Sequence, residues 1–361
     1  RRQNRNNSQL DVAYNAYNLA VLQAFGLKEV LKSSGNSVNI INYRPPYKIN
    51  SYRKFNPRNW LSKNPYKCII RFFTEIIVKP TRIKRWYSFE HFMNKYLDLC
   101  PYDKDDDYSA FQALVLGSDQ IWNPGLTGGN FDKVYFGGNA KCDIISYAAS
   151  SRFDSLTVEQ KDFFSNALHK LKQVSVRESS LANLLQPLIN KKVFTVVDPT
   201  LLAGKEIFDK IAISPNEKKY LLLYQIGQWD KLNAFTAKIA RKLDLEVIEI
   251  VSHPMMPKKG RIQTASPCEF IGYFKNASFV VTTSFHGLAF SLMYEKEFYC
   301  LKQNTNADLR LLSLLNKLGL SNRFLESDEE PTFDSIDFLS VNDKLKKEIL
   351  YSKEYLNNAL N

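Results

Sequence analysis

The residues best suited to chemistry lie in the segment VVTTSFHGLAFSLMYEKEFY, from Val280 to Tyr299. Its apolar, β-branched start ends at Thr282-Thr283-Ser284, and a helical pattern follows His286-Gly287. The pattern predicts a strand, a tight turn and a helix that begins beside His286. Free backbone N–H groups and the positive end of a helix dipole would then lie next to an imidazole. Such a site binds an anion and exchanges protons near neutral pH. The alternative is a histidine that only caps or packs at a turn.

Polar loops follow other predicted strands as well. A short buried strand within Ala113–Pro124 runs into a Gly-Ser-Asp loop, and the strand Asp143–Ser151 ends in small residues. Further strands are predicted within Val174–Ser180 and Val193–Leu202. Because open α/β sheets bind ligands at the carboxyl ends of their strands, we expect these loops to converge on one cleft.

The elements that must position these loops alternate along the chain. Helices are predicted over about Tyr14–Lys32, Thr157–Leu171 and Leu232–Leu243, and further strands over Ser37–Tyr43, Tyr220–Ile226 and Leu245–Val251. A charged stretch, Ala212–Lys219, has the composition of a linker. The alternation predicts an α/β protein of two doubly wound, Rossmann-like domains with a cleft between them. We place them at residues 1–211, with a basic and aromatic insertion at about 47–97, and 212–340, followed by a C-terminal helix at 341–361.

Composition limits the class of protein. The 361 residues are 44% hydrophobic and carry a net charge of +12. No run of 18 apolar residues predicts a transmembrane helix, and the N-terminus has no signal-peptide core. The first residue is Arg rather than Met, so the sequence leaves open whether further residues precede it. Five scattered cysteines favour reduced thiols in the cytoplasm over a zinc site. The charge is compatible with nucleic acid, an anionic membrane or anionic substrates. Because no zinc-finger or aromatic RNA-binding signature accompanies it, we expect no nucleic-acid partner.

Five motifs in order resemble the polysaccharide pyruvyl transferase family: GSDQIWN (117–123), SYAASS (146–151), SVRE (175–178), VVDPTLL (196–202) and TTSFHG (282–287). The segment beginning YNLAVLQA at Tyr17 is similar to the family's opening, although Leu19 stands where Gly is usual and no first strand is recognisable in residues 1–13. The resemblance covers about residues 17–325. It implies a fold like that of GT-B glycosyltransferases.

The resemblance also implies an activity. The family transfers a carboxyethylidene group from phosphoenolpyruvate to two hydroxyls of a sugar. The acceptor is typically a precursor of a capsule or exopolysaccharide, often linked to a polyprenyl diphosphate. No cofactor is implied beyond phosphoenolpyruvate as the donor, and no metal-ligand cluster is apparent.

The resemblance assigns roles to particular residues. His286 is the expected general acid or base, and Arg177 the expected anion-binding residue, unless Arg177 and Glu178 form only a surface ion pair. Ser284 and the N–H groups from Phe285 through Gly287 to Leu288 are expected to bind phosphate.

The first domain supplies further candidates. Asp119 is expected to accept a proton from a sugar hydroxyl or to orient it, with an Asx turn as the alternative. Ser118 and Trp122 lie in the same loop; a buried Trp122 would instead be a core residue. Some relatives carry Arg in place of Ser284 and Lys near Asn306, so Asn306 is a candidate too, and Arg310 or Lys302 is expected to supply the charge. Asp198-Pro199 suits a structural turn.

The insertion suggests where the protein acts. Six cations lie among aromatic and aliphatic residues in the segment Asn59–Tyr87: Lys67, Arg71, Lys79, Arg82, Lys84 and Arg85. Such a segment either contacts an anionic bilayer surface or packs on the first domain with solvated charges. The expectation is a cytoplasmic enzyme, peripheral on the inner face of the plasma membrane. The alternatives are a nucleotide-sugar glycosyltransferase of GT-B fold and a non-catalytic binding protein of polysaccharide assembly.

Overall fold

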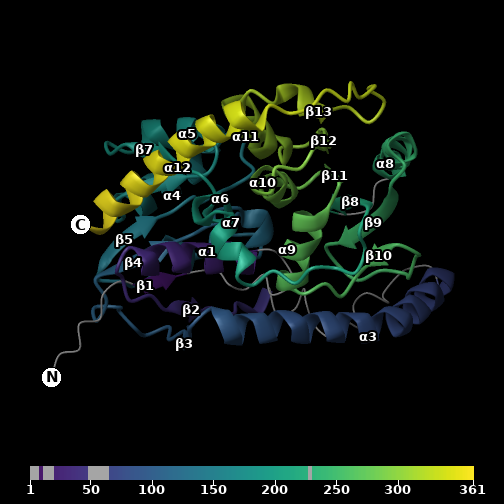
Figure 1. Cartoon of the computed structure of the whole chain (residues 1–361). Coiled ribbons are helices and arrows are strands. Elements are labelled where there is room, and N and C mark those ends of the chain that lie inside the picture. Colours follow the sequence, from purple (N-terminus) through teal and green to yellow (C-terminus); the bar gives the residue numbers. More distant parts are fainter. Residues whose placement is uncertain (1–7, 11–19, 48–64, 227–229) are drawn as a thin grey trace.

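The first of two parallel β-sheets lies in the N-terminal part of the chain (Figure 1). The structure is a computed structural model and describes residues 8–10, 20–47, 65–226 and 230–361. This sheet has the order β3-β2-β1-β4-β5. A parallel pair, β6 and β7, continues it through bridges from Ile145 to Gln173 and from Ala149 to Val176. The strands are β1 (Ser8–Leu10), β2 (Ile40–Asn42), β3 (Leu99–Pro101), β4 (Ala113–Leu116), β5 (Asp143–Ser146), β6 (Val174–Val176) and β7 (Val193–Thr195).

The second sheet has the order β10-β9-β8-β11-β12-β13. Its strands are β8 (Tyr220–Gln225), β9 (Glu246–Val251), β10 (Arg261–Ile262), β11 (Phe279–Thr282), β12 (Phe298–Leu301) and β13 (Phe324–Leu325). Counted from its own first strand, the first sheet runs 3-2-1-4-5 and the second runs 3-2-1-4-5-6, which is the order of the Rossmann fold. The predicted fold class, two doubly wound Rossmann-like domains, is confirmed.

Helices connect the strands of both sheets. They are α1 (Ala20–Ser33), α3 (Pro65–Tyr96), α4 (Val158–His169), α5 (Ser179–Leu185), α6 (Pro199–Ala203), α7 (Lys205–Asp209), α8 (Asp230–Leu243), α9 (Pro267–Asn276), α10 (Phe285–Met293), α11 (Asp308–Leu318) and α12 (Phe338–Leu360). Helix α4 begins at its predicted place because Thr157 and Gln160 form a capping box. The predicted start of the first helix, residues 14–19, lies outside the described residues.

The first strand corrects the sequence analysis. β1 is present at Ser8–Leu10 and pairs in parallel with both β2 and β4 at the centre of the sheet. With three residues, Ser-Gln-Leu, it is too short to show a hydrophobic period. The segment predicted as a strand from Val193 to Leu202 is a strand only over Val193–Thr195, and Asp198 is the N-cap of α6.

One hydrophobic cluster joins the two domains. The ring of Phe208 lies 5.9 Å from that of Phe25 on α1 and 5.4 Å from that of Phe290 on α10. Helix α12 returns to the first domain, where Tyr355 donates a hydrogen bond to the carbonyl of Ser146 and Ser352 accepts one from the N–H of Val197. These contacts hold the strand ends of both sheets in one arrangement.

Helix α3 is the longest element and runs along one side of both domains (Figure 1). Its C-terminal half packs on α1 through Phe92, whose ring lies 6.0 Å from that of Phe25. Nearer its middle, Arg85 donates hydrogen bonds to the carbonyls of Val251 and Gln263 in the second domain. No helix among the described residues is long and apolar enough to cross a membrane.

Candidate active site

The turn before α10 places His286 at the carboxyl end of β11. Thr282 holds this turn: its hydroxyl donates to the carbonyl of Tyr224 at 2.6 Å and accepts from the N–H of Ser284 at 3.0 Å. A Cβ at Gly287 would lie 2.2 Å from that hydroxyl, so only glycine lets the helix approach so closely. The strand, turn and helix predicted from sequence are therefore all present, and Ser284 is the N-cap.

The loop after β4 brings Asp119 to the site from the first domain. Gly117 has a φ of +129°, and a Cβ there would lie 2.1 Å from the carbonyl oxygen of Tyr147. Asp119 has a φ of +71°, a left-handed conformation that Asp adopts more readily than most residues. The Asp119 carbonyl accepts from the N–H of Ser150, which joins this loop to the one after β5. The backbone thus fixes where the Asp119 carboxylate lies.

Arg177, which follows β6, is the centre of a buried charge cluster. Its Nη1 donates to Asp198 at 2.7 Å, and its Nη2 approaches Asp119 at 3.5 Å and donates to Ser150 at 3.1 Å. Its guanidinium carbon lies 4.4 Å from the ring centroid of Phe285 in the other domain. The surface ion-pair alternative is wrong, because Arg177 is buried and Glu178 lies 3.9 Å away as one of three surrounding carboxylates.

The charges in this cluster depend on one another. Burial alone would lower the pKa of Arg177, but Asp198, Asp119 and Glu178 raise it above its ordinary value. Burial would raise the pKa of Asp198, yet Arg177 and other neighbours hold it below the usual range. For Glu178 burial prevails, and its pKa is raised. Arg177 therefore holds neighbouring carboxylates in place through its two Nη atoms, whereas its buried Nε has no hydrogen-bond partner among the described residues.

Replacing Arg177 with methionine is expected to destabilise the protein. The change leaves buried carboxylates without their cation, a loss of about 3–5 kcal/mol in the free energy of unfolding. Urea unfolding measures it, with Arg241→Met, an exposed arginine on α8, as the matched control. A double variant, Arg177→Met with Asp198→Asn, should recover part of the loss. An Arg177→Met protein as stable as the control would contradict the buried cluster.

His286 lies against this cluster from the second domain. Burial lowers the pKa of His286, while Asp198 and Asp119 act in the opposite direction. The imidazole is therefore neutral at pH 7. Its Nε2 atom and the hydroxyl of Ser284 are buried, and neither has a hydrogen-bond partner among the described residues. Buried polar atoms normally have partners, so these two are available to a ligand.

Arg310 on α11 approaches the same cluster. It is buried, and its Nε has no hydrogen-bond partner in the described part of the chain. Burial, followed by repulsion from Arg177, lowers its pKa to about 10, whereas Asp119 and Glu178 act in the opposite direction without forming an ion pair with it. Arg152 also acts on it electrostatically. A buried cation without an ion-pair partner is costly unless an anion joins it.

Two predicted site residues are corrected by the structure. Trp122 is fully buried, stacks on Phe136 at 5.4 Å and donates its indole N–H to the carbonyl of Tyr135. It belongs to the core of the first domain and cannot stack on a sugar. The hydroxyl of Ser118 donates to the carbonyl of Ala148 and accepts from Gln23, so it is occupied within the loop.

Asn306 and Lys302 lie at the margin of the site. Asn306 donates to the carbonyl of Arg152 at 3.1 Å, which links the second domain to the first. Lys302 pairs with Glu326 at 3.3 Å. Of the two cations expected to replace the missing family charge, Arg310 is therefore the one that faces Arg177.

Two residues of the cluster were not predicted as functional. Gln23 on α1 donates to Asp198 at 2.5 Å and to Ser118 at 3.2 Å. Asp198 does form the expected turn, because it accepts from the N–H and hydroxyl of Thr200, but its second oxygen also binds Arg177. The only indication in the sequence was that Gln23 lies in the motif AVLQA and Asp198 in the motif VVDPTLL. No local pattern predicts the hydrogen bond between them.

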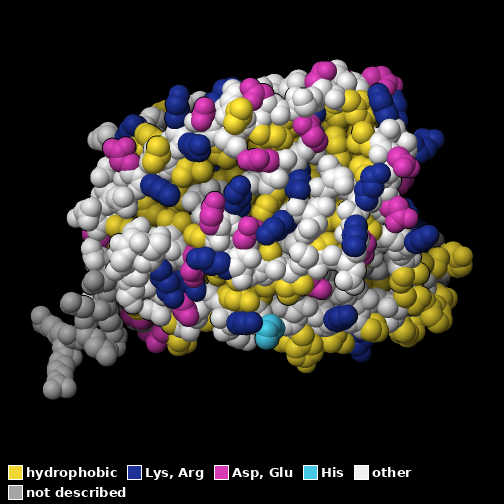
Figure 2. Space-filling view, in the orientation of Figure 1, with side chains coloured by type: hydrophobic (Ala, Val, Ile, Leu, Met, Phe, Trp, Pro, Cys, Tyr) yellow, Lys and Arg dark blue, Asp and Glu magenta, His cyan; other side chains and the backbone are white. Residues whose placement is uncertain are grey.

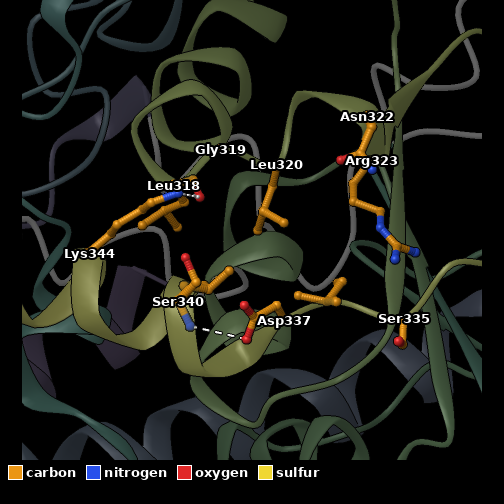
Figure 3. A pocket seen from close by; sticks show the side chains of 11 residues that line it. Leu318, Gly319, Leu320, Asn322, Arg323, Ser335, Asp337, Ser340 and Lys344 are labelled. Atoms are coloured by element: carbon orange, nitrogen blue, oxygen red, sulfur yellow. Dashed lines mark hydrogen bonds between the residues drawn. The ribbon is translucent and has the colours of Figure 1, made fainter.

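A small cavity of about 20 Å³ lies between the domains and is lined by Arg177, Asp198 and Phe285, among others. A separate pocket of about 190 Å³ lies between the end of α11 and the start of α12 (Figure 3). Its charged groups are already bonded: Lys344 donates to the carbonyl of Leu318, and Asp337 accepts from the N–H of Ser340. This second pocket has no contact with the charge cluster and is not the candidate site.

Metal chemistry was not predicted from sequence. Within the described residues, no group of three or more His, Cys, Asp and Glu side chains could hold a metal ion. The five cysteines are free thiols.

Comparisons with known proteins identify relatives. A model of the polysaccharide pyruvyl transferase family matches residues 20–305. No curated protein matches the chain. Among solved structures, it is similar to UDP-GlcNAc 2-epimerase from Methanocaldococcus jannaschii, with 12% identity over 90% of this chain and 89% of that one and a TM-score of 0.44. It is also similar to UGT89C1 of Arabidopsis thaliana, with 9% identity, coverage of 94% and 96%, and a TM-score of 0.43. The fold assignment rests on the strand order of the chain itself.

Proposed function

Because the chain belongs to the polysaccharide pyruvyl transferase family, and is therefore a transferase enzyme, we propose that it moves a carboxyethylidene group from phosphoenolpyruvate to two hydroxyls of a sugar. The proposed acceptor is a precursor of a capsule or exopolysaccharide. The observation that best supports a dianionic donor is the group of buried polar atoms without partners at the junction of the domains: Arg310 Nε, Ser284 Oγ and His286 Nε2.

These groups suit phosphoenolpyruvate in different ways. Its phosphate and carboxylate require cations and oriented N–H donors. Arg310 offers a guanidinium that pairs with no carboxylate of the described residues, and the start of α10 offers the N–H groups of Phe285, His286 and Gly287. The carboxylates of Asp119, Asp198 and Glu178 lie near Arg310 and the start of α10. They would repel a bound anion from the side of Arg177. The donor is thus expected to lie against α10 and α11.

The chemistry requires proton transfers at separate atoms. The methylene carbon of phosphoenolpyruvate, an enol phosphate, gains a proton and becomes a methyl group. The oxygen of the first sugar hydroxyl bonds to the central carbon and releases its proton. The carbon–oxygen bond to phosphate breaks, and the second hydroxyl closes the ketal with loss of its own proton. A neutral His286 suits the role of base for a hydroxyl, and Asp119 suits that of orienting it.

The proposed acceptor is linked to a polyprenyl diphosphate. An enzyme with such a substrate works at a bilayer surface, and we place this one in the cytoplasm on the inner face of the plasma membrane. The basic and apolar helix α3 supports that location.

The direct test is release of phosphate from phosphoenolpyruvate in the presence of lipid-linked sugars. We expect release only when an acceptor is present, together with a product that has gained a carboxyethylidene group by mass spectrometry. Matched reactions contain a nucleotide sugar in place of phosphoenolpyruvate. Sugar transfer in those reactions, without any use of phosphoenolpyruvate, would favour the glycosyltransferase alternative. Absence of phosphate release with every acceptor tested would leave the proposal unsupported.

A further inference from the structure

The N-terminal half of α3 turns an apolar stripe away from the protein. Ile69, Ile70, Phe73, Ile76 and Ile77 recur at intervals of three and four residues, so they share one side of the helix. All five are exposed, Phe73 to 58%. Figure 2 shows apolar side chains gathered where this part of α3 lies. In most surface helices the apolar stripe faces the core, so the outward stripe requires an explanation.

The opposite side of the helix is fixed to the protein, so the stripe cannot rotate inward. Val78 is buried there, and Arg82 forms a bidentate pair with the buried carboxylate of Glu75. Arg85 is buried and donates to the carbonyls of Val251 and Gln263. Two of the six cations expected to face a membrane, Arg82 and Arg85, therefore have structural roles.

Two of the remaining cations accompany the stripe. Lys84 lies on the same side of the helix and Lys79 at its border, whereas Lys67 and Arg71 precede Glu75 at intervals of four residues and so lie on the opposite side. All four are exposed, and the only acidic residue between Pro65 and Tyr87 is the buried Glu75. The loop after β9 begins beside Arg85 of α3, because Val251 ends that strand and accepts from Arg85. It adds an exposed Met256 and the exposed Lys258 and Lys259.

The surface also has a defined relation to the candidate active site. Val251 is the last residue of β9, and Gln263 follows β10, so α3 contacts the carboxyl edge of the second sheet. That edge also carries the turn from Thr282 to His286, because the strands of this sheet are parallel. A flat partner on the stripe would therefore lie beside the edge that holds the site.

We propose that the outward side of α3, with the Met256–Lys259 loop, docks on the surface of an anionic lipid bilayer. The apolar stripe enters the interface, and the surrounding cations bind anionic head groups. A second copy of the chain fits less well, because a symmetric pair would bring the same cations together. The proposed benefit, delivery of a lipid-linked acceptor to the site, rests on the proposed function; the docking itself does not.

The test is sedimentation with vesicles of phosphatidylcholine containing about one third phosphatidylglycerol. We expect the wild-type protein to sediment with them and the triple variant Ile69→Glu, Phe73→Glu, Ile77→Glu to show at least about a tenfold lower partition coefficient, since three apolar side chains leave the interface. The matched control is Leu339→Glu with Leu350→Glu, two exposed leucines on α12, which should bind as the wild type does. Lys79→Gln with Lys84→Gln should weaken binding most at low salt.

Several outcomes would overturn the docking proposal. Wild-type protein that stays in solution would do so, as would a triple variant that still sediments. A wild-type dimer that the triple variant converts to a monomer, without vesicle binding, would assign the stripe to a second copy. Turnover of phosphoenolpyruvate with a water-soluble sugar acceptor should be equal in all variants. If the wild type and all variants lack that turnover while the wild type still binds vesicles, the result would count against the proposed function and not against the docking proposal.

Discussion

Replacing His286 with alanine is expected to lower kcat by ~10²–10⁴-fold while the fold survives. The imidazole is buried at the start of α10, with Asp198 and Asp119 close enough to act on its charge. Its Nε2 has no partner in the described part of the chain, so the change removes no hydrogen bond at that atom. The loss should therefore appear in phosphate release and be accompanied by little change in the urea unfolding curve.

The pH dependence separates a chemical role from a packing role. Burial lowers the pKa of His286, so the neutral form that accepts a proton persists below the ordinary value of 6.5. Activity that depends on this form is present above the lowered pKa and is lost as the pH falls through it. The residual activity of His286→Gln should not show this fall at low pH.

A matched control is His169→Ala, an exposed histidine at the end of α4. It should leave both kcat and the pH profile unchanged. A folded His286→Ala protein with nearly wild-type kcat would remove the imidazole from the mechanism and leave it a packing role.

The sequence could predict the His286 turn because its signal is local. A β-branched run, a Thr-Thr-Ser turn and an apolar helix lie within twenty residues, and the close approach of Gly287 to Thr282 follows from the same segment. The alternation of such segments was also enough to predict two Rossmann-like domains. β1 was missed because it has three residues and its stability comes from β2 and β4 on either side.

The hydrogen bonds from Arg177 to Asp198 and Asp119 could not be predicted from a local pattern. Its partners Asp198 and Asp119 lie 21 and 58 residues away in the sequence, and only the parallel strand ends bring them together. The same holds for Trp122, whose burial depends on Phe136 and Phe164. The side of α3 that faces the protein was likewise set by distant groups, the carbonyls of Val251 and Gln263, rather than by its own apolar residues.

Replacing Arg310 is expected to weaken the binding of phosphoenolpyruvate more than any other change in the second domain. A charge-assisted hydrogen bond contributes about 1.5–3 kcal/mol, so Arg310→Met should raise the KM for the donor about 10- to 150-fold. Arg310→Lys keeps a charge but loses the planar fork, so an intermediate KM is expected. The matched control is Lys317→Met, which changes another residue of α11. It removes only an exposed ion pair with Glu348 on α12 and should leave KM unchanged.

Stability distinguishes a binding role of Arg310 from a structural one. Burial lowers the pKa of Arg310 to about 10, so its charged form is less stable at this position than in water. Methionine removes that cost and keeps an unbranched apolar side chain, so Arg310→Met should unfold at the same or a higher urea concentration than the wild type. Phosphoenolpyruvate should raise the wild-type midpoint but not that of the variant. A variant that unfolds more easily and keeps its KM would show that Arg310 supports the fold, and the anion would then have to bind elsewhere.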